Sequence, residues 1–256
     1  MPPARYQRWI NTQILSAVLD RVRDEDGDPL FTLKGGAAME LRLGLTARAS
    51  KDYDAVFRER ADAMLDALDR ALSNDWQGFQ LERTGPRPIG PTNAVQIDIK
   101  LAYRGKSWGT VRLEVSPAEG QAGREVDRVP ARPLDAVRLE GPERIACVSL
   151  RYQIAQKLHA CTYVRNDGQP NDRFRDVIDL LLLRDLIDDP QLSAIREACI
   201  EIFTLRDTHA WPPTVTVWPE WAAGFASLAA DVHFYTSDAT VAVGDLERFI
   251  AAINAA

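Results

Sequence analysis

The chain has 256 residues, of which 46% are hydrophobic and 27% are charged, and its formal net charge is −6. This composition is typical of a folded protein with one domain or two closely apposed domains, and it excludes the disordered and fibrous classes. The net charge excludes no class of partner, because residues 185–256 carry eleven acidic side chains against three arginines and the rest of the chain is slightly basic.

The cysteines and the apolar runs predict a cytoplasmic protein that does not bind membranes. Cys147, Cys161 and Cys199 are odd in number and lack C-x-x-C spacing, which favours buried free thiols over a disulfide framework or a zinc site. No apolar run approaches the roughly 18 residues of a membrane span. The first residues also lack the apolar core of a signal peptide.

The first part of the chain is expected to mix helices and strands. Residues 5–23 carry apolar side chains at helical spacing, and residues 31–36, FTLKGG, indicate a short strand that ends in a glycine pair. A short helix is expected over 37–44, since its last residue is a glycine, the usual terminator. Residues 52–57 alternate as a strand, and residues 60–72 have the apolar stripe of a helix.

Two longer strands and then a series of helices are expected in the rest of the chain. Residues 95–103 and 110–117 alternate apolar and polar side chains, and the segment between them suits a hairpin. The Gly-, Pro- and Arg-rich stretch 118–142 is interpreted as a connection. Helical stripes then recur over 144–164, 173–186, 191–205 and 244–254. We predict an α+β fold with two domains, residues 1–135 and residues 136–256.

One stretch combines a glycine pair with an S-x-D-x-D sequence. Gly35 and Gly36, between a strand and a helix, leave room for a phosphate near backbone amides and the positive end of the helix dipole. Asp52 and Asp54 are two apart on a strand, so they project from the same face and could bind the same divalent cation or pair of cations. Ser50 could help the glycines to hold a triphosphate. The alternative is that these are ordinary turn and solvent-facing residues.

A third carboxylate on a neighbouring strand would favour a metal-dependent phosphoryl-transfer site. Asp98 and Glu114 each lie opposite the apolar face of their strand, and both are candidates. The pattern alone does not separate them.

A second cluster of charged residues lies on the expected helices. Lys157 is on a largely apolar helix, and Asp176 and Asp179 are close to one turn apart on the next helix, so they share a face. The lysine could bind nucleotide phosphates while the aspartates hold it in place or contact the nucleotide. The alternative is a structural ion pair between two packed helices.

These residues together resemble a known family. The run LKGGAAMELRLGLTARASKDYDAVF and the stretches QIAQKLHA and PNDRFRDVIDLLLL are similar, in matching order over about residues 30–185, to the AbiEii/AbiGii nucleotidyltransferase toxins of type IV toxin–antitoxin systems. The family includes the MenT-type enzymes. The resemblance implies a nucleotidyltransferase fold of the DNA polymerase β type, with a mixed sheet, flanking helices and a C-terminal helical domain.

The resemblance also implies roles for individual residues. It makes Gly35, Gly36 and Ser50 phosphate-binding, Asp52, Asp54 and Glu114 metal-binding, and Lys157, Asp176 and Asp179 nucleotide-binding, with Asp52, Asp54, Lys157 and Asp176 as the catalytic set. It favours Glu114 over Asp98 because the family carries its third acid on the strand after the hairpin. Family members usually have Lys where this chain has Arg175, which keeps the charge.

The reaction implied by the resemblance is transfer of NMP from an NTP substrate to an acceptor hydroxyl, with release of pyrophosphate and with Mg²⁺ (or Mn²⁺) as cofactor. For MenT-like relatives the acceptor is the 3′ end of tRNA, and modification there blocks translation. A cognate antitoxin is implied, and it need not bind the toxin directly. The alternatives are a protein or small-molecule nucleotidyltransferase, and a catalytically silent nucleotide-binding protein.

Overall fold

In the computed structural model, which describes residues 3–90, 93–165 and 167–256, the chain forms two compact units. The first unit comprises the residues through Gly44 and Ala49–Val148, and the second comprises Leu45–Arg48 and Ser149–Ala256. The expected boundary after residue 135 falls earlier than this division, because residues 136–148 include a strand that joins the sheet of the first unit.

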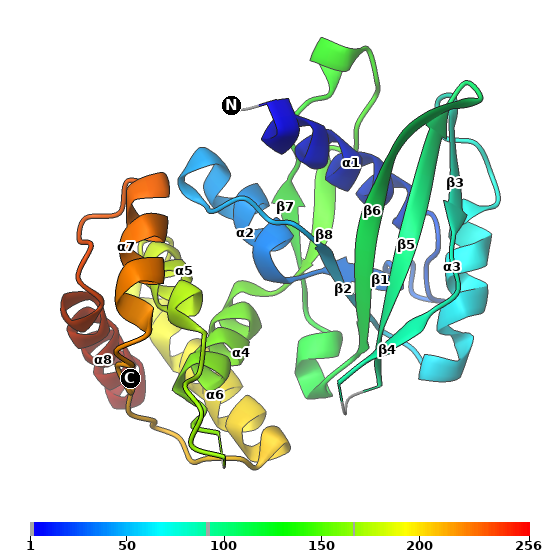
Figure 1. Cartoon of the computed structure of the whole chain (residues 1–256). Helices are drawn as coiled ribbons and strands as arrows, with labels where there is room; N and C mark the ends of the chain where they lie inside the picture. Colours follow the sequence, from blue (N-terminus) through cyan, green and yellow to red (C-terminus); the bar gives the residue numbers. More distant parts are fainter. Residues whose placement is uncertain (1–2, 91–92, 166) are drawn as a thin grey trace. The chain divides into compact units, whose positions relative to one another are not determined.

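The first unit is built on one mixed β-sheet (Figure 1). Its strands are β1 (Phe31–Leu33), β2 (Tyr53–Phe57), β3 (Phe79–Arg83), β4 (Arg87–Ile89), β5 (Ala94–Tyr103), β6 (Lys106–Pro117), β7 (Val126–Pro130) and β8 (Arg144–Val148). The strand order is β3-β5-β6-β2-β1-β8-β7, with β4 also paired to β5. The pairs β2–β6 and β1–β8 are parallel and the other pairs are antiparallel. The predicted hairpin of β5 and β6 is confirmed.

Strands β7 and β8 lie where the sequence patterns indicated other structure. Residues 144–148 form β8, so the prediction of a helix over 144–164 is wrong at its start, and β7 lies within the stretch interpreted as a connection. The residues of β8 after its first are buried between β1 and β7, with Cys147 opposite Leu33 of β1. A short apolar run buried in this way has no periodicity that distinguishes a strand from a buried helix, so pairing with distant strands decided its structure.

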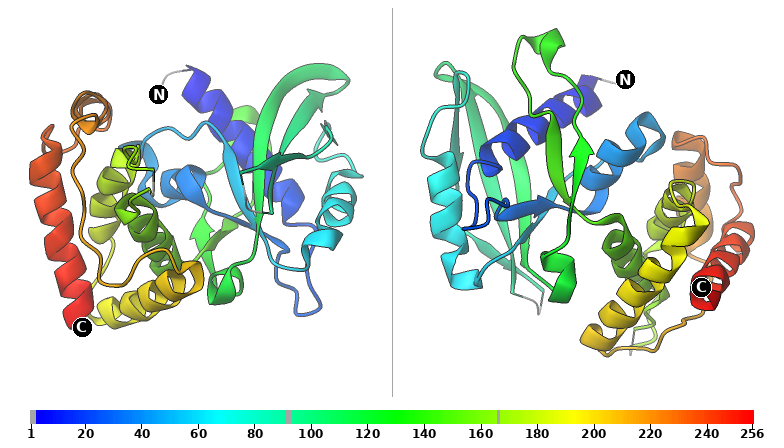
Figure 2. Two further views of the ribbon diagram at one scale, coloured as in Figure 1. Left: turned by 60° about the horizontal axis from the view of Figure 1, so that its bottom comes forward. Right: turned by 180° about the vertical axis from the view of Figure 1, so that it is seen from behind.

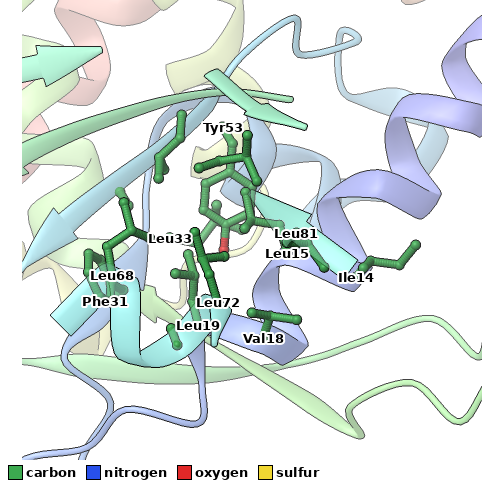
Figure 3. Packing of buried hydrophobic residues seen from close by; sticks show 14 of the residues in the cluster. Ile14, Leu15, Val18, Leu19, Phe31, Leu33, Tyr53, Leu68, Leu72 and Leu81 are labelled. Atoms are coloured by element: carbon green, nitrogen blue, oxygen red, sulfur yellow. The ribbon is translucent and has the colours of Figure 1, made fainter. Parts of the chain in front are cut away.

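The helices of the first unit are α1 (Pro3–Leu19), α2 (Gly35–Leu43) and α3 (Met64–Leu72). Short 3₁₀ turns are η1 (Gly44–Thr46), η2 (Ala61–Ala63), η3 (Gly120–Gly123), η4 (Asp135–Val137) and, in the second unit, η5 (Asp189–Gln191). Leu15 and Leu19 of α1 pack with Leu68 of α3 and with Leu33 and Tyr53 of the sheet (Figure 3). Burial of such side chains contributes about 1.5–3 kcal/mol each before entropy is counted, which is enough to fix both helices on the sheet.

The two faces of the central strands differ in character. Tyr53 of β2, Leu113 of β6 and Ile97 of β5 are buried in the core, whereas Asp54 and Glu114 point from the opposite face and are partly exposed. This follows from the two-residue period of a strand. The polar face therefore gathers the acidic residues that the sequence patterns singled out.

The second unit is helical (Figure 2). Its α-helices are α4 (Leu150–Thr162), α5 (Phe174–Arg184), α6 (Leu192–Arg206), α7 (Trp221–Asp231) and α8 (Ala239–Ala255). Helix α4 packs on α5 and α6, and α8 contacts α5, α6 and α7. The predicted helices over 173–186 and 191–205 are confirmed, while α7 had not been predicted. None of the helices in the described parts of the chain has both the length and the apolar character needed to cross a bilayer.

Candidate active site

The glycine pair begins α2, and the carboxylate of Asp54 lies against this helix start. Gly35 has a φ angle of +61°, and a Cβ atom there would lie 2.1 Å from Asp54 Oδ2. The backbone amide of Lys34 donates a hydrogen bond to the carbonyl oxygen of Asp54 at 2.9 Å. Both the backbone conformation and the available space therefore require glycine at position 35. The positive end of the helix dipole also favours an anionic group beside it.

Asp54 and Glu114 are direct neighbours on the polar face of the sheet. They are register partners on the parallel strands β2 and β6, and both side chains are partly buried. Gln96 of β5, the partner of Glu114 on its other side, donates from Nε2 to Glu114 Oε1 at 3.3 Å. Since adjacent strands lie about 4.8 Å apart, the two carboxylates are close enough to serve the same cation.

Asp52 and Asp98 occupy the neighbouring row of this face. Asp52 directly precedes β2, and its Oδ1 lies 3.4 Å from Nη1 of Arg112. Arg112 is the register partner of Asp98, whose Oδ2 accepts a hydrogen bond from Arg87 Nη2 at 2.9 Å. Asp98 is thus paired with an arginine and lies one row away from Asp54. Glu114, in contrast, lies directly beside Asp54 on the strand next to β2.

Ser50 lies in a turn that two side chains hold in place. Its backbone amide donates to Glu40 Oε2 at 3.1 Å, and its hydroxyl donates to the carbonyl oxygen of Asp52 at 2.8 Å. The other oxygen of Glu40 accepts from Arg5 Nε at 3.0 Å. Sequence reasoning missed Glu40. Glu40 is the acidic residue of α2 and follows the glycine pair and the apolar residues after it. This position next to the glycine motif could have indicated a role for Glu40 in the site.

The donor types on the polar face fit a divalent cation such as Mg²⁺, which prefers carboxylate oxygens and water. Asp54 and Glu114 supply adjacent carboxylates, and the carboxylate of Asp52 forms a long ion pair with an arginine that is more than half exposed. Such exposed pairs contribute little free energy, so Asp52 can turn at small cost. Within the described residues, no three His, Cys, Asp or Glu side chains are gathered as a metal-binding group.

In the second unit, Lys157 forms a buried ion-pair cluster with two aspartates. Its Nζ lies 2.6 Å from Asp176 Oδ1 and 2.7 Å from Asp179 Oδ2, and all three residues are buried. Burial alone would lower the pKa of Lys157, but the negative charges of Asp176 and Asp179 outweigh it and raise the pKa. Burial alone would raise the pKa of Asp176, but the Lys157 ammonium lowers it overall. Lys157 and Asp176 therefore stabilise each other's charged forms.

Arg48 also belongs to this cluster, and the patterns gave it no such role. Its Nε lies 3.2 Å from Asp179 Oδ2, the same oxygen that accepts from Lys157. Arg173 lies farther away, with Nη1 3.8 Å from Asp176 Oδ2. No local sequence signal pairs Arg48 with Asp179, because this partner is on a helix far along the chain.

The structure thus brings the predicted site residues together in two groups. In the first unit, Gly35 and Asp54 meet at the start of α2 with Glu114 alongside, and Ser50 and Asp52 share a turn. In the second unit, Lys157, Asp176 and Asp179 form a second group with Arg48.

Comparison with solved structures finds similar folds. The nucleotidyltransferase toxin MenT4 from Mycobacterium tuberculosis H37Rv has a TM-score of 0.53 and 15% sequence identity, and the match covers 97% of this chain and 92% of that chain. An antigenic nucleotidyltransferase-like protein from Paracoccidioides brasiliensis has a TM-score of 0.49 and 16% identity, covering 79% and 89%. At such identities the likeness to MenT4 concerns the fold, and it confirms the predicted mixed sheet with flanking helices. A search of curated proteins found no significant sequence match.

Comparison with protein families gives the relationship directly. The family described as "Nucleotidyl transferase AbiEii toxin, Type IV TA system" matches residues 17–252, nearly the whole chain. The match includes the glycine pair, the S-x-D-x-D run and the Lys157 cluster. The chain therefore belongs to the AbiEii family of type IV toxin–antitoxin systems and is a nucleotidyltransferase.

Proposed function

We propose that this nucleotidyltransferase transfers NMP from an NTP to the 3′ end of tRNA in the cytoplasm, releases pyrophosphate and so blocks translation. The observation that carries the proposal is the placement of Asp54 and Glu114 side by side, with the Asp54 carboxylate against the glycine start of α2. This arrangement combines carboxylate oxygens for a cation with a helix N-terminus for phosphate. The tRNA acceptor is proposed from the resemblance to MenT-like enzymes.

In the proposed reaction, the 3′ hydroxyl oxygen of the acceptor forms a bond to the α-phosphorus of the NTP. The bond from that phosphorus to the bridging oxygen breaks, and pyrophosphate leaves with the electron pair. The proton of the hydroxyl passes to a carboxylate of the Asp54 and Glu114 pair. Asp52, Asp54 and Glu114 would hold Mg²⁺ (or Mn²⁺), which would supply electrostatic stabilisation of the phosphoryl charge.

The residues of the chain mainly bind and orient the substrates. We assign Gly35 and Gly36 to the phosphates, because a glycine start of a helix directs backbone amides at an anion. Ser50 is assigned to the same task, in a turn already ordered by Glu40. Positioning of this kind lowers the barrier by removing the entropy cost of bringing two reactants together.

We assign Lys157, Asp176 and Asp179 to nucleotide binding. The Lys157 ammonium has three N–H donors, and the described residues accept hydrogen bonds from two of them through Asp176 and Asp179, so we assign the third to a phosphate oxygen. A raised pKa keeps this lysine charged at every physiological pH.

The cognate antitoxin that the family implies is a further partner, with direct binding left to experiment.

The test is incubation of the purified protein with each radiolabelled NTP, Mg²⁺ and total tRNA. We expect one or more NTPs to label RNA, and Asp54→Asn to reduce the label about 100-fold or more. Asp62→Asn is the matched control, because Asp62 is exposed and its ion-pair partner, Arg60, is exposed as well. Periodate-treated tRNA, which lacks the terminal ribose hydroxyls, should accept no label.

Other outcomes would redirect the assignment. Label on protein, or on a small hydroxyl compound without RNA, would replace tRNA as the acceptor. NTP binding without transfer to any acceptor would indicate a silent nucleotide-binding protein. Equal labelling by wild type and Asp54→Asn would contradict the proposed site.

A further inference from the structure

The Lys157 cluster contains a fully buried carboxylate that depends on Arg48. Asp179 has no exposed surface, and its Oδ2 accepts from both Lys157 Nζ and Arg48 Nε. Its other oxygen, Oδ1, is buried and has no hydrogen-bond partner within the described residues. Asp179 is therefore held in place through a single oxygen, and two cations share that oxygen.

Lys157 and Arg48 lie closer to the two aspartates of this cluster than Arg173 does. Lys157 and Arg48 carry two positive charges, and Asp176 and Asp179 carry two negative charges. Without Arg48, Asp179 would share Lys157 with Asp176, and the more distant Arg173 pairs with Asp176 rather than with Asp179 in the described residues. A buried carboxylate without compensation either takes a proton or draws its remaining cation closer. Either response would change the position or the hydrogen bonds of the Lys157 ammonium.

Arg48 also has a distinctive place in the chain. It lies two residues before Ser50 and four before Asp52, yet the short segment Leu45–Arg48 groups with the helical unit. Ala47, within this segment, is completely buried. The run that leads into the S-x-D-x-D sequence is thus anchored by a buried side chain and by the ion pair of Arg48.

We propose that Arg48 is a positioning residue for nucleotidyl transfer: by neutralising and orienting Asp179, it fixes the Lys157 ammonium in the orientation that binds the nucleotide. This rests on the proposed function, because it assigns Lys157 to the nucleotide. Arg48 itself need not touch substrate. It differs in this from an arginine that merely attracts RNA, whose removal would weaken RNA binding and leave Lys157 unchanged.

The first measurement observes Lys157 directly. The chain has five lysines, and Lys51, Lys100 and Lys106 are exposed, so an NMR spectrum of ¹⁵N-labelled lysine ammonium groups is sparse. A buried ammonium with two hydrogen bonds exchanges its protons slowly with solvent. Its NMR signal is identified by its absence from the spectrum of Lys157→Arg. We expect Arg48→Gln to shift or broaden this signal, and Arg48→Lys to restore most of it, since the contact uses only one guanidinium nitrogen.

The matched control is Arg83→Gln. Arg83 has the same side-chain exposure as Arg48, 23%, but its partner Asp69 is 53% exposed, against 1% for Asp179. We expect Arg83→Gln to leave the Lys157 signal and the kinetics unchanged. An unchanged Lys157 signal in Arg48→Gln would overturn the proposal.

The second measurement is the kinetics of transfer at saturating tRNA. We expect Arg48→Gln to lower kcat on the order of 10- to 100-fold, with Arg48→Lys recovering most of it. The double variant Arg48→Gln/Asp179→Asn keeps the cluster neutral and should fold, as checked by circular dichroism, yet it should remain slow because Lys157 loses its oriented partner. Wild-type kcat in the folded double variant, or a rise only in the KM for tRNA, would overturn the positioning role.

The same spectra separate this proposal from the proposed function. Titration with each NTP and Mg²⁺ should move the Lys157 signal in the wild type and should do so at higher NTP concentrations in Arg48→Gln. If NTP moves the signal but nothing is transferred to tRNA, the acceptor assignment fails and the role of Arg48 stands. If no NTP moves the signal, Lys157 does not bind nucleotide and the inference fails.

Discussion

A side chain at Gly35 and the carboxylate of Asp54 cannot occupy the structure together, since a Cβ atom at position 35 would lie 2.1 Å from Asp54 Oδ2. Cβ atoms essentially never approach another atom this closely. The glycine therefore does more than allow a turn. It makes room for a carboxylate at the start of α2, which couples the helix and strand β2 in one structural unit.

This relationship predicts that Gly35→Ala displaces Asp54 and strongly lowers activity. We expect nucleotidyl transfer to fall on the order of 100-fold, because a displacement of about 1 Å is enough for that loss. Transfer is measured with labelled NTP and tRNA, and folding by thermal unfolding.

The control for this prediction is Gly105→Ala in the β5–β6 hairpin. Gly105 also has a positive φ angle, +77°, but a Cβ atom there would have no neighbour within 4 Å among the described residues. It should lose ~1 kcal/mol of stability from backbone strain and keep wild-type activity. If both variants lose activity equally, strain rather than the clash with Asp54 is responsible.

The register of β2 and β6 predicts which carboxylate is the third acid. Glu114→Gln should lower transfer on the order of 100-fold or more, because Glu114 adjoins Asp54. Asp98→Asn should change the rate by less than about threefold, since Asp98 is paired with Arg87 in the neighbouring row. The comparison is made at several Mg²⁺ concentrations. A larger loss in Asp98→Asn would assign the role to Asp98 instead.

Removal of the Lys157 cation should destabilise the helical unit strongly. Lys157→Met leaves two buried carboxylates facing each other, and breaking a buried pair in this way typically costs about 3–5 kcal/mol. Urea unfolding followed by circular dichroism measures the change. Lys157→Met/Asp176→Asn, which removes one of the two negative charges, should recover part of the loss. A loss below about 1 kcal/mol in the single variant would contradict the buried ion pair.

The pKa directions predict how this contribution depends on pH. Folding lowers the pKa of Asp176 below its ordinary value of 3.8. The Asp176 carboxylate therefore contributes its full stabilisation above pH 3.8, and this stabilisation is lost as the pH falls through the lower pKa of the folded state. The pKa of Lys157 is raised from 10.5, so its effect is complete below that value and is lost as pH rises through the higher one. The stability difference between wild type and Asp176→Asn, measured from pH 3 to pH 9, should be flat near neutrality and shrink only in acid.

The three thiols should be unreactive in the folded protein. All three cysteines are free and buried, as the sequence pattern predicted. Burial raises the pKa of Cys147 to about 12 and also raises the pKa of Cys161 and Cys199. A disulfide reagent at pH 8 should therefore release no colour from the native protein and should detect all three thiols in guanidinium. Rapid reaction without denaturant would show that at least one thiol is accessible.

The local patterns of the sequence determined much of this protein. The alternation of apolar and polar residues predicted β5 and β6, and the helical stripes predicted α5 and α6, because strand and helix periods are properties of short segments. The glycine pair, the S-x-D-x-D run and the Lys157 motifs, taken in order, were enough to indicate the family that the whole-chain match confirms.

The tertiary structure decided what no short segment encodes. Residues 144–148 became β8 because β1 and β7 pair with them on either side. Glu114 rather than Asp98 lies next to Asp54 because the parallel pairing of β2 and β6 sets that register. Arg48 forms an ion pair with Asp179 although the two residues are far apart in the sequence. Hydrogen bonding between distant strands and the compensation of a buried charge depend on which residues meet after folding. They leave no periodic signal in the sequence.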